Sequence, residues 1–358
     1  MSSEIYSVIT GTGKYIPERR IANEDFLTHE FYEKDRLKID KTNQEIIDKF
    51  LEITTIAERR YVSDDLTTSD IAYFAAIDAI KTANIDKEEL DHIIVAHNFG
   101  DIKKNNRQLD IVPTLAARVK HKLKIKNPNC IAYDLPFGCP GWLQAVIQAD
   151  YYIKSGDNKK VLVIGADVLS RISDPHDRDG MIYADGAGAV ILEARKSDTP
   201  IGILAHKTRS DTLIYSKMLF MGKSYNDDDN GDFFLKMNGR RLYQYALETV
   251  PAVIKESLEK CNILPSEINK ILIHQANGKM DDAILKRFFK LYDLDDIPKD
   301  IMPMTISWLG NSSVASVPTL LDLILKDELK PHKINKGDTL VFASVGAGMN
   351  INAMVYKV

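Results

Sequence analysis

Apolar residues along the chain fall into short runs that alternate with longer segments of helical character. The short runs, rich in β-branched residues, predict strands at 6–11, 92–97, 130–135, 160–167, 189–194, 270–275, 338–344 and 351–358. The longer segments predict helices at 67–83, 141–154, 240–260, 279–291 and 314–325, and the helix that follows Cys139 is apolar nearly all round. Strands that alternate with helices in this way predict an α/β fold, in which helices cover both faces of a mainly parallel or mixed sheet.

One part of this pattern occurs twice. Residues 80–95 (IKTANIDKEELDHIIV) align without a gap on residues 258–273 (LEKCNILPSEINKILI). Both copies show a helix end, a turn, a short acidic helix and a buried strand. The offset between the copies is about half of the chain, which indicates a duplicated domain rather than a solenoid. We therefore predict two halves, 1–195 and 196–358, and a site between them would draw residues from both.

Composition narrows the class of protein. The 358 residues are 44% hydrophobic and 27% charged, as in an ordinary globular protein, and the net charge of −4 argues against nucleic acid as the main partner. No apolar run approaches the length of a membrane span, and the start MSSEIYSVITG does not resemble a secretory signal. Three widely spaced cysteines suit a reducing compartment. We predict a cytoplasmic protein.

Two polar segments interrupt the pattern of strands and helices. Residues 28–49 are strongly charged with few apolar anchors, and residues 221–232 form an acidic stretch rich in Gly and Asn. We interpret both as insertions or mobile loops with solvated surfaces. The adjacent carboxylates of Asp227, Asp228 and Asp229 lack the spaced partners of a calcium loop, so we predict no metal site.

Cys139 lies where a predicted strand meets a predicted helix, within YDLPFGCPGWLQAVI (133–147). Pro140 would take the first helical position, where its missing N–H would have had no partner in any case. This placement aims the thiol at the positive end of the helix, which favours a thiolate and hence a nucleophile. The alternative is a small buried residue that fills a gap, and the local sequence leaves both interpretations open.

Other residues with catalytic side chains lie at predicted strand ends and turns. His274 ends a buried strand at the edge where α/β proteins place their sites, although a purely structural histidine is the alternative and His97 is its rival in the first half. Asn311 stands in the turn GNSS, where it could also serve as a helix cap. The turn from Gly346 to Gly348 can leave backbone N–H groups free to face an oxyanion.

Four motifs, in identity and order, resemble those of one protein family. They are the core from GCPGW (138–142) to AVILEA (189–194), HQAN (274–277), GNSSVASVP (310–318) and SVGAGM (344–349). The chain resembles the β-ketoacyl-acyl-carrier-protein synthase III family of the thiolase superfamily, from about residue 5 to the C-terminus. The resemblance implies a homodimer with a thiolase-like duplicated αβαβα layered fold and two pseudo-symmetric halves.

The resemblance also implies a role for each catalytic candidate. Cys139, in the first half, matches the nucleophile that forms a thioester with the acyl group. His274 and Asn311, in the second half, match the pair that donates hydrogen bonds to the thioester oxygen of a malonyl group as it loses carbon dioxide. The N–H of Cys139 and one from Gly346, Ala347 or Gly348 would hold the oxyanion. A His/Asn pair and the lack of a second cysteine in that turn separate this type from elongating ketosynthases and thiolases.

The substrate contacts implied by the resemblance are less complete. Arg178 in DPHDR matches an arginine that contacts the phosphates of coenzyme A, but the tryptophan and arginine that grip the nucleotide have no counterparts in 44–60. The sequence therefore leaves open whether the acyl donor is carried by coenzyme A or by an acyl carrier protein. Val112 occupies a position that lines the acyl pocket of the neighbouring subunit, where a valine leaves room for a longer or branched chain. We also expect Tyr243 and Asn277 to contact substrate.

A row of basic residues follows the HQAN motif along one predicted helix. A basic patch suits an acidic acyl carrier protein, and a solvated surface with no partner is the alternative. The residues are Lys279, Lys286, Arg287 and Lys290.

We predict an acyltransferase that condenses an acyl thioester with malonyl-acyl carrier protein by decarboxylation, giving 3-oxoacyl-acyl carrier protein in fatty acid biosynthesis. Coenzyme A and phosphopantetheine thioesters are its substrates, and we expect no other cofactor, no nucleic acid and no membrane span. A ketosynthase or acyltransferase of secondary metabolism that joins longer chains is the first alternative. The second is a non-catalytic acyl-binding partner subunit, against which the presence of Cys139, His274 and Asn311 counts.

Overall fold

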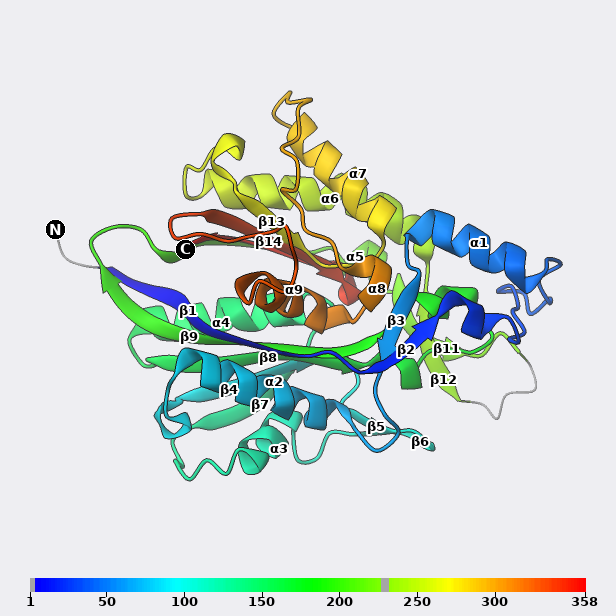
Figure 1. Ribbon diagram of the computed structural model, residues 1–358, viewed down its shortest axis with the longest axis horizontal. Helices are drawn as coiled ribbons and strands as arrows, with labels where there is room; N and C mark the ends of the chain where they lie inside the picture. Colours follow the sequence, from blue (N-terminus) through cyan, green and yellow to red (C-terminus); the bar gives the residue numbers. More distant parts are fainter. Residues whose placement is uncertain (1–3, 227–231) are drawn as a thin grey trace.

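The computed structural model describes residues 4–226 and 232–358, which form five stacked layers (Figure 1). Two mixed β-sheets alternate with three layers of helices, in the order helix, sheet, helix, sheet, helix. The α/β architecture predicted from the alternation of strands and helices, and from the resemblance to the thiolase superfamily, is thereby confirmed.

Each sheet combines parallel and antiparallel pairs. The first has the order β1 (Glu4–Tyr15), β9 (Asp185–Ser197), β8 (Lys160–Val168), β4 (His92–His97), β7 (Ile131–Pro136), and β4 is parallel to both of its neighbours. The second has the order β10 (Gly202–Ser210), β15 (Asn350–Lys357), β14 (Thr339–Gly346), β13 (Lys270–Ile273), and only β13 and β14 are parallel. The strands of the first sheet end at Ser197 and those of the second begin at Gly202, close to the boundary between residues 195 and 196 that we propose for the two halves.

Two helices fill the space between the sheets, α4 (Gly141–Ser155) and α9 (Ser316–Leu325) (Figure 1). Their apolar residues pack in one cluster with residues of both sheets, among them Trp142 of α4 and Phe342 of β14. A helix that is buried on nearly all sides needs apolar residues around its whole circumference. This explains why the segment after Cys139 lacks a polar face.

The outer layers repeat one arrangement. On one side α2 (Thr68–Ala83) packs on the first sheet, and on the other α6 (Gly239–Glu259) packs on the second. Each helix leads through a short 3₁₀ helix into the strand that follows it, β4 or β13. Asn84 and Asn262, which align in the sequence repeat, both have a positive φ, of 53° and 55°. Asparagine tolerates this left-handed conformation well, so the repeat conserves a helix stop as well as a hydrophobic pattern.

The prediction of a loop throughout 28–49 is wrong, because its last part belongs to helix α1 (Asn43–Thr54). Thr42 accepts the backbone N–H of Glu45, whose carboxylate in turn accepts the N–H of Thr42, which forms a capping box. Ile46 and Phe50 are buried beneath this cap. The few apolar residues of a charged segment are therefore enough to anchor a helix when they lie on one face.

The remaining elements are short or peripheral: α3 (Leu115–Lys122), α5 (Thr212–Tyr215), α7 (Gly278–Lys290), α8 (Ile306–Leu309), β2 (Arg19–Ala22), β3 (Glu58–Tyr61), β5 (Asp101–Lys103), β6 (Asn106–Asp110), β11 (Leu219–Lys223) and β12 (Phe233–Met237). β11 and β12 form a hairpin on either side of 227–231, so the three aspartates at 227–229 lie outside the described residues.

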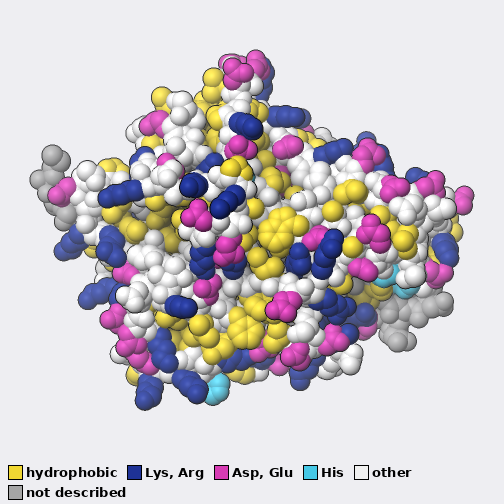
Figure 2. Space-filling view, in the orientation of Figure 1, with side chains coloured by type: hydrophobic (Ala, Val, Ile, Leu, Met, Phe, Trp, Pro, Cys, Tyr) yellow, Lys and Arg dark blue, Asp and Glu magenta, His cyan; other side chains and the backbone are white. Residues whose placement is uncertain are grey.

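The face of the molecule drawn in Figure 2 shows no dominant sign of charge. Lys and Arg side chains are interspersed with Asp and Glu over the face in Figure 2, with apolar side chains between them. Across residues 4–226 and 232–358, none of the helices has both the length and the apolar character that a bilayer span requires.

Candidate active site

A cavity of about 660 Å³ brings the three catalytic candidates together. Cys139, His274 and Asn311 all line it, although they come from three segments that are far apart in the sequence. The cavity also has four exposed basic side chains in its wall: Lys34, Lys41, Lys49 and Arg240. Since His274 and Asn311 are buried, the cavity leads from a basic mouth to a buried end that holds the candidate catalytic groups.

Cys139 lies in the turn between β7 and α4, but not quite as predicted. The helix begins at Gly141, so Pro140 is its N-cap and not its first helical residue. Burial raises the pKa of the Cys139 thiol to about 11, the opposite of the shift expected from the helix terminus. The cost of removing a thiolate from water therefore outweighs its attraction to the helix in the resting site.

His274 follows β13 and is held at both its backbone and its ring. Its N–H donates to Ala343 O at 2.9 Å, and its Nδ1 lies 2.7 Å from Ser316 Oγ. Burial lowers the pKa of His274 to about 4, so the imidazole is neutral near pH 7. When the single hydrogen of the Ser316 hydroxyl points to Nδ1, and not to Ser313 O at 2.9 Å, the ring proton lies on Nε2, where a neutral imidazole can donate a hydrogen bond.

His97, the other candidate histidine, makes structural contacts through both ring nitrogens. His97 Nε2 lies 3.1 Å from Asp134 Oδ2, and its Nδ1 accepts the N–H of Gly100 at 3.0 Å. These contacts engage both ring nitrogens, and His97 is not among the described residues that line the cavity. Of the two strand-end histidines, only His274 has a place beside Cys139.

Asn311 combines the two roles that its sequence context left open. Its N–H donates to Ile182 O and its carbonyl accepts the N–H of Ala184, both at 2.9 Å, so the turn is fastened to a neighbouring loop. Its Oδ1 accepts the N–H of Ser313 at 2.8 Å, which is a capping contact within the turn. This contact fixes the orientation of the amide and leaves Nδ2 as its donor group at the cavity wall.

The glycine turn after β14 lies against Cys139. A Cβ added to Gly346 would come within 2.8 Å of Cys139 N, and one added to Gly138 within 3.1 Å of Ala347 N. Of the three turn residues proposed for the oxyanion, Ala347 lines the cavity, and Gly346 and Gly348 are not among its described lining residues. The N–H groups of Cys139 and Ala347 are thus the pair best placed to act together.

This close approach predicts the effect of a single methyl group. Gly346→Ala should displace the Cys139 backbone and lower the rate of Cys139 acylation about 100-fold, because small misplacements of a nucleophile are costly. Gly239→Ala is the matched control, since its Cβ would meet nothing nearer than 3.6 Å. Intact-protein mass after timed exposure to an acyl donor measures both. Equal rates in the two variants would show that the contact at Gly346 is unimportant.

Three of the four predicted substrate residues line the cavity, and the fourth does not. Arg178, Tyr243 and Asn277 line the cavity, and Arg178 forms an ion pair with Glu33 at 3.0 Å. Val112 does not line it, and its side chain is 84% exposed. An acyl pocket in this subunit therefore receives nothing from its own Val112.

The predicted basic patch lies on the outer surface of α7. All four of its side chains are exposed, and Lys290 lies 3.5 Å from Asp295. The residues are Lys279, Lys286, Arg287 and Lys290.

Several lining residues had no strong signal in the sequence. Asn98 follows the strand end at His97, and Ser313 lies two residues after Asn311, so both stood next to residues that were singled out. Asp179 follows Arg178 in the cavity wall, and burial raises its pKa to about 6. Phe50 enters the wall from α1, a helix that the charged pattern concealed.

Two family models match the chain. One describes 3-oxoacyl-[acyl-carrier-protein (ACP)] synthase III and matches residues 133–212, and the other describes the C-terminal part of that enzyme and matches 258–358. A β-ketoacyl-[acyl-carrier-protein] synthase III from Xanthomonas campestris pv. campestris is 33% identical over 352 residues, which are 97% of each chain.

Solved structures agree with these matches. The 3-oxoacyl-[acyl-carrier-protein] synthase III of Aquifex aeolicus superposes with a TM-score of 0.79 at 30% identity, covering 98% of this chain and all of its own. The synthase of Thermus thermophilus gives 0.80 at 29% identity, covering 98% and 99%. OleA from Xanthomonas campestris shares the fold, with a TM-score of 0.76 at 17% identity, covering 99% and 98%.

The layered fold and the cysteine, histidine and asparagine at one cavity define a condensing acyltransferase of the thiolase-like class. The chain belongs to the 3-oxoacyl-acyl-carrier-protein synthase III family.

Proposed function

We propose that the protein is a 3-oxoacyl-acyl-carrier-protein synthase that takes an acyl group onto Cys139 and condenses it with malonyl-acyl carrier protein. The observation that carries the proposal is the convergence of Cys139, His274 and Asn311 at one cavity. Each of these residue types fills a different chemical requirement of the reaction, and the three would have no reason to meet in a passive acyl-binding subunit.

In the first half-reaction, the Cys139 sulfur attacks the thioester carbon of the donor. The thiol loses its proton as the new C–S bond forms, and the carrier leaves as a thiolate that is then protonated, so the acyl group moves from one sulfur to another. The N–H groups of Cys139 and Ala347 would stabilise the oxyanion formed between these steps. With a thiol pKa of about 11, removal of the proton contributes to the barrier of this half-reaction.

In the second half-reaction, malonyl thioester loses carbon dioxide and leaves an enolate. Hydrogen bonds from His274 Nε2 and Asn311 Nδ2 to the thioester oxygen would stabilise the enolate charge. A neutral imidazole suits this role, because it donates a hydrogen bond without transferring its proton. The enolate carbon then attacks the acyl carbon on Cys139, the C–S bond breaks, and the cysteine thiolate takes up a proton.

The basic mouth supports a phosphate-bearing carrier. Lys41, Lys49 and Arg240 are exposed at the cavity, and Arg178 lies beside them in its wall. Coenzyme A and carrier-bound phosphopantetheine both carry phosphate, so this feature supports either donor. The exposed basic face of α7 further supports an acidic acyl carrier protein as partner.

An open sheet edge supports a homodimer. β7 is the last strand of the first sheet, and its Ile131 side chain is 51% exposed. Exposed Leu109 lies near the end of β6, and exposed Ile111 and Val112 follow it before α3. An unprotected edge strand with apolar neighbours favours pairing with another chain, and a second copy would also give Val112 a cavity to enter. Three free cysteines support a reducing, cytoplasmic location.

A second candidate is a condensing enzyme for longer acyl chains. Much of the cavity wall is apolar, with Phe50, Ile53, Leu219, Leu235 and Leu242 among its side chains. An extended apolar wall favours a long chain over a two-carbon unit.

A donor panel separates the two candidates. Short, branched and long acyl groups, each on coenzyme A and on acyl carrier protein, are mixed with the enzyme and malonyl-acyl carrier protein, and products are identified by mass. We expect a 3-oxoacyl-carrier product from at least one donor. A product in which two long chains are joined would favour the second candidate. An enzyme that accepts no acyl group from any donor would contradict both.

A further inference from the structure

We propose that the Ser313 hydroxyl, oriented by Asn98, donates a hydrogen bond to Cys139 and stabilises its thiolate both as attacking group and as leaving group. Ser313 Oγ lies 3.3 Å from Cys139 Sγ, and both residues line the cavity. The proposal deepens the proposed function by adding a residue that acts directly on the reacting sulfur, and it rests on that function for its consequence in turnover.

The direction of this hydrogen bond follows from the other contact of the hydroxyl. Asn98 Nδ2 donates to Ser313 Oγ at 2.8 Å. An amide N–H can only donate, so the serine oxygen is the acceptor there, and its own hydrogen is free to point at the sulfur. A hydroxyl that donates to sulfur favours the thiolate over the thiol, since the negative charge strengthens the hydrogen bond.

Asn98 is itself fixed by a buried carboxylate. Its N–H donates to Asp167 Oδ1 at 2.8 Å, and its Nδ2 lies 2.5 Å from Asp167 Oδ2. Asp167 lies on β8 and is 1% exposed. The amide is therefore held from two sides, which fixes its face toward Ser313. The result is a chain of contacts from Asp167 through Asn98 and Ser313 to Cys139.

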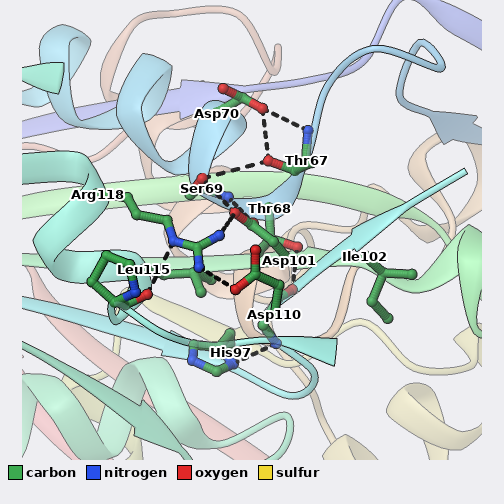
Figure 3. A network of polar contacts seen from close by, with 12 residues as sticks. Thr67, Thr68, Ser69, Asp70, His97, Asp101, Ile102, Asp110, Leu115 and Arg118 are labelled. Atoms are coloured by element: carbon green, nitrogen blue, oxygen red, sulfur yellow. Dashed lines mark hydrogen bonds and ion pairs between the residues drawn. The ribbon is translucent and has the colours of Figure 1, made fainter. Parts of the chain in front are cut away.

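The chain on the C-terminal side of Asn98 is also immobilised (Figure 3). Asp101 accepts the N–H of Ser69 at the start of α2 and an Nη1–H of Arg118, both at 2.7 Å. On the N-terminal side, His97 accepts the N–H of Gly100. These contacts tie the segment after β4 to two helices, so Asn98 has little freedom to turn away from Ser313.

The backbone of Ser313 is equally constrained. Its φ is 53°, a left-handed conformation that is unfavourable for serine and tends to persist where neighbouring contacts require it. Its N–H donates to Asn311 Oδ1, and its carbonyl oxygen lies 2.9 Å from Ser316 Oγ. Ser316 is in turn the partner of His274. Ser313 thus contacts Cys139 and Asn311 directly and His274 through Ser316. These contacts hold its backbone in the left-handed conformation.

Several titratable groups surround the sulfur and set its pH response. Asp167 lies behind Asn98, His274 approaches from the end of β13, and Tyr183 also lines the cavity. Burial raises the pKa of Asp167 to about 6 and that of Tyr183 well above its usual value, and it lowers that of His274 to about 4. None of these three pKa values lies between pH 7 and 10. In that range the rate at which Cys139 reacts therefore follows the ionisation of its own thiol.

The test measures Cys139 alkylation by iodoacetamide against pH, which needs no acyl donor and is independent of the proposed function. Ser313→Ala removes the hydroxyl and keeps both backbone contacts, and we expect about a tenfold lower rate at pH 8. Ser312→Ala, which removes the neighbouring buried hydroxyl, is the matched control and should behave as wild type. Asn98→Ala should shift the rate in the same direction by a smaller factor.

A second variant separates the loss of the hydroxyl from a loss of folding. Ser313→Gly relieves the left-handed backbone and also lacks the hydroxyl, so it should show the same tenfold loss with no loss of thermal stability. A wild-type alkylation profile in either Ser313 variant would overturn the proposal. An unchanged profile in Asn98→Ala alone would overturn the orienting role of Asn98. If alkylation falls as expected and no acyl donor reacts with wild type, the proposed function fails while the hydrogen bond stands.

Discussion

Replacing Cys139 by alanine is expected to abolish the acyl-enzyme and to lower condensation by at least about 10⁴-fold. The thiol supplies the only atom in the proposed reaction that carries the acyl group between its two carriers, and no neighbouring side chain in the described cavity offers a second thiol. Intact-protein mass after addition of an acyl donor measures the first effect, and mass analysis of the carrier protein measures the second.

The other two cysteines provide the control for this result. Cys261→Ala removes a half-buried thiol that packs against the core cluster of the second half, outside the described cavity lining, and should leave both signals unchanged. Cys130 is buried and is not among the described residues that line the cavity, so it should not accept an acyl group either. A donor-dependent mass gain that persists in Cys139→Ala would place the nucleophile elsewhere and reject the proposed mechanism.

Replacing His274 by alanine is expected to separate the two half-reactions. Release of carbon dioxide from malonyl-acyl carrier protein should fall by about 10²- to 10³-fold, which is the usual effect of losing one donor to a developing oxyanion. Acylation of Cys139 should change only a few-fold, since His274 acts on the malonyl group in this mechanism. The two rates are measured separately, by trapped carbon dioxide and by intact-protein mass.

The pH dependence provides a second check on His274. Its pKa of about 4 lies below the value of an unfolded histidine, so the neutral form prevails above about pH 5 and the decarboxylation rate should show no histidine inflection from pH 6 to 8. His121→Ala, at an exposed position on α3, is the matched control and should match wild type. If acylation falls as much as decarboxylation in His274→Ala, the imidazole acts on the Cys139 proton instead.

Local pattern was enough to predict most of the framework. The predicted strand at 92–97 is β4 to the residue, and the predicted helix at 141–154 is α4 within one residue at its end. Both are continuous apolar segments whose spacing directly reflects burial on the strand or helix. β10 was not predicted, because its exposed end, with residues such as Arg209, breaks the apolar run.

The sequence predicted which residues meet at the site, but it did not predict the pKa shift of Cys139. Motif order brought Cys139, His274 and Asn311 into one hypothesis, and the structure places all three at one cavity. The expected thiolate at the helix terminus was wrong in the direction of its pKa shift. A sequence shows that a helix starts after a cysteine, but the degree of desolvation depends on what the second sheet and its turns place around it.

Charge also concealed part of the cavity. Residues 28–49 look like a solvated loop because lysine and glutamate dominate the stretch, yet Ile46 and Phe50 fall on one face of α1 and are buried. The hydrophobic pattern of a short helix is weak when only a few residues face the core. Whether such a helix forms depends on the surface that is available to receive it.

By itself, the sequence determined the alternation of strands and helices, the internal repeat and the identities of the three candidate catalytic residues, because these follow from local spacing and short motifs. Only the tertiary structure decided how far burial shifts the pKa of Cys139, and that Ser313 contacts both Asn98 and the Cys139 sulfur. These are contacts between segments as many as 215 residues apart. They depend on how two sheets pack around shared helices, and no local pattern encodes that distance or that dielectric environment.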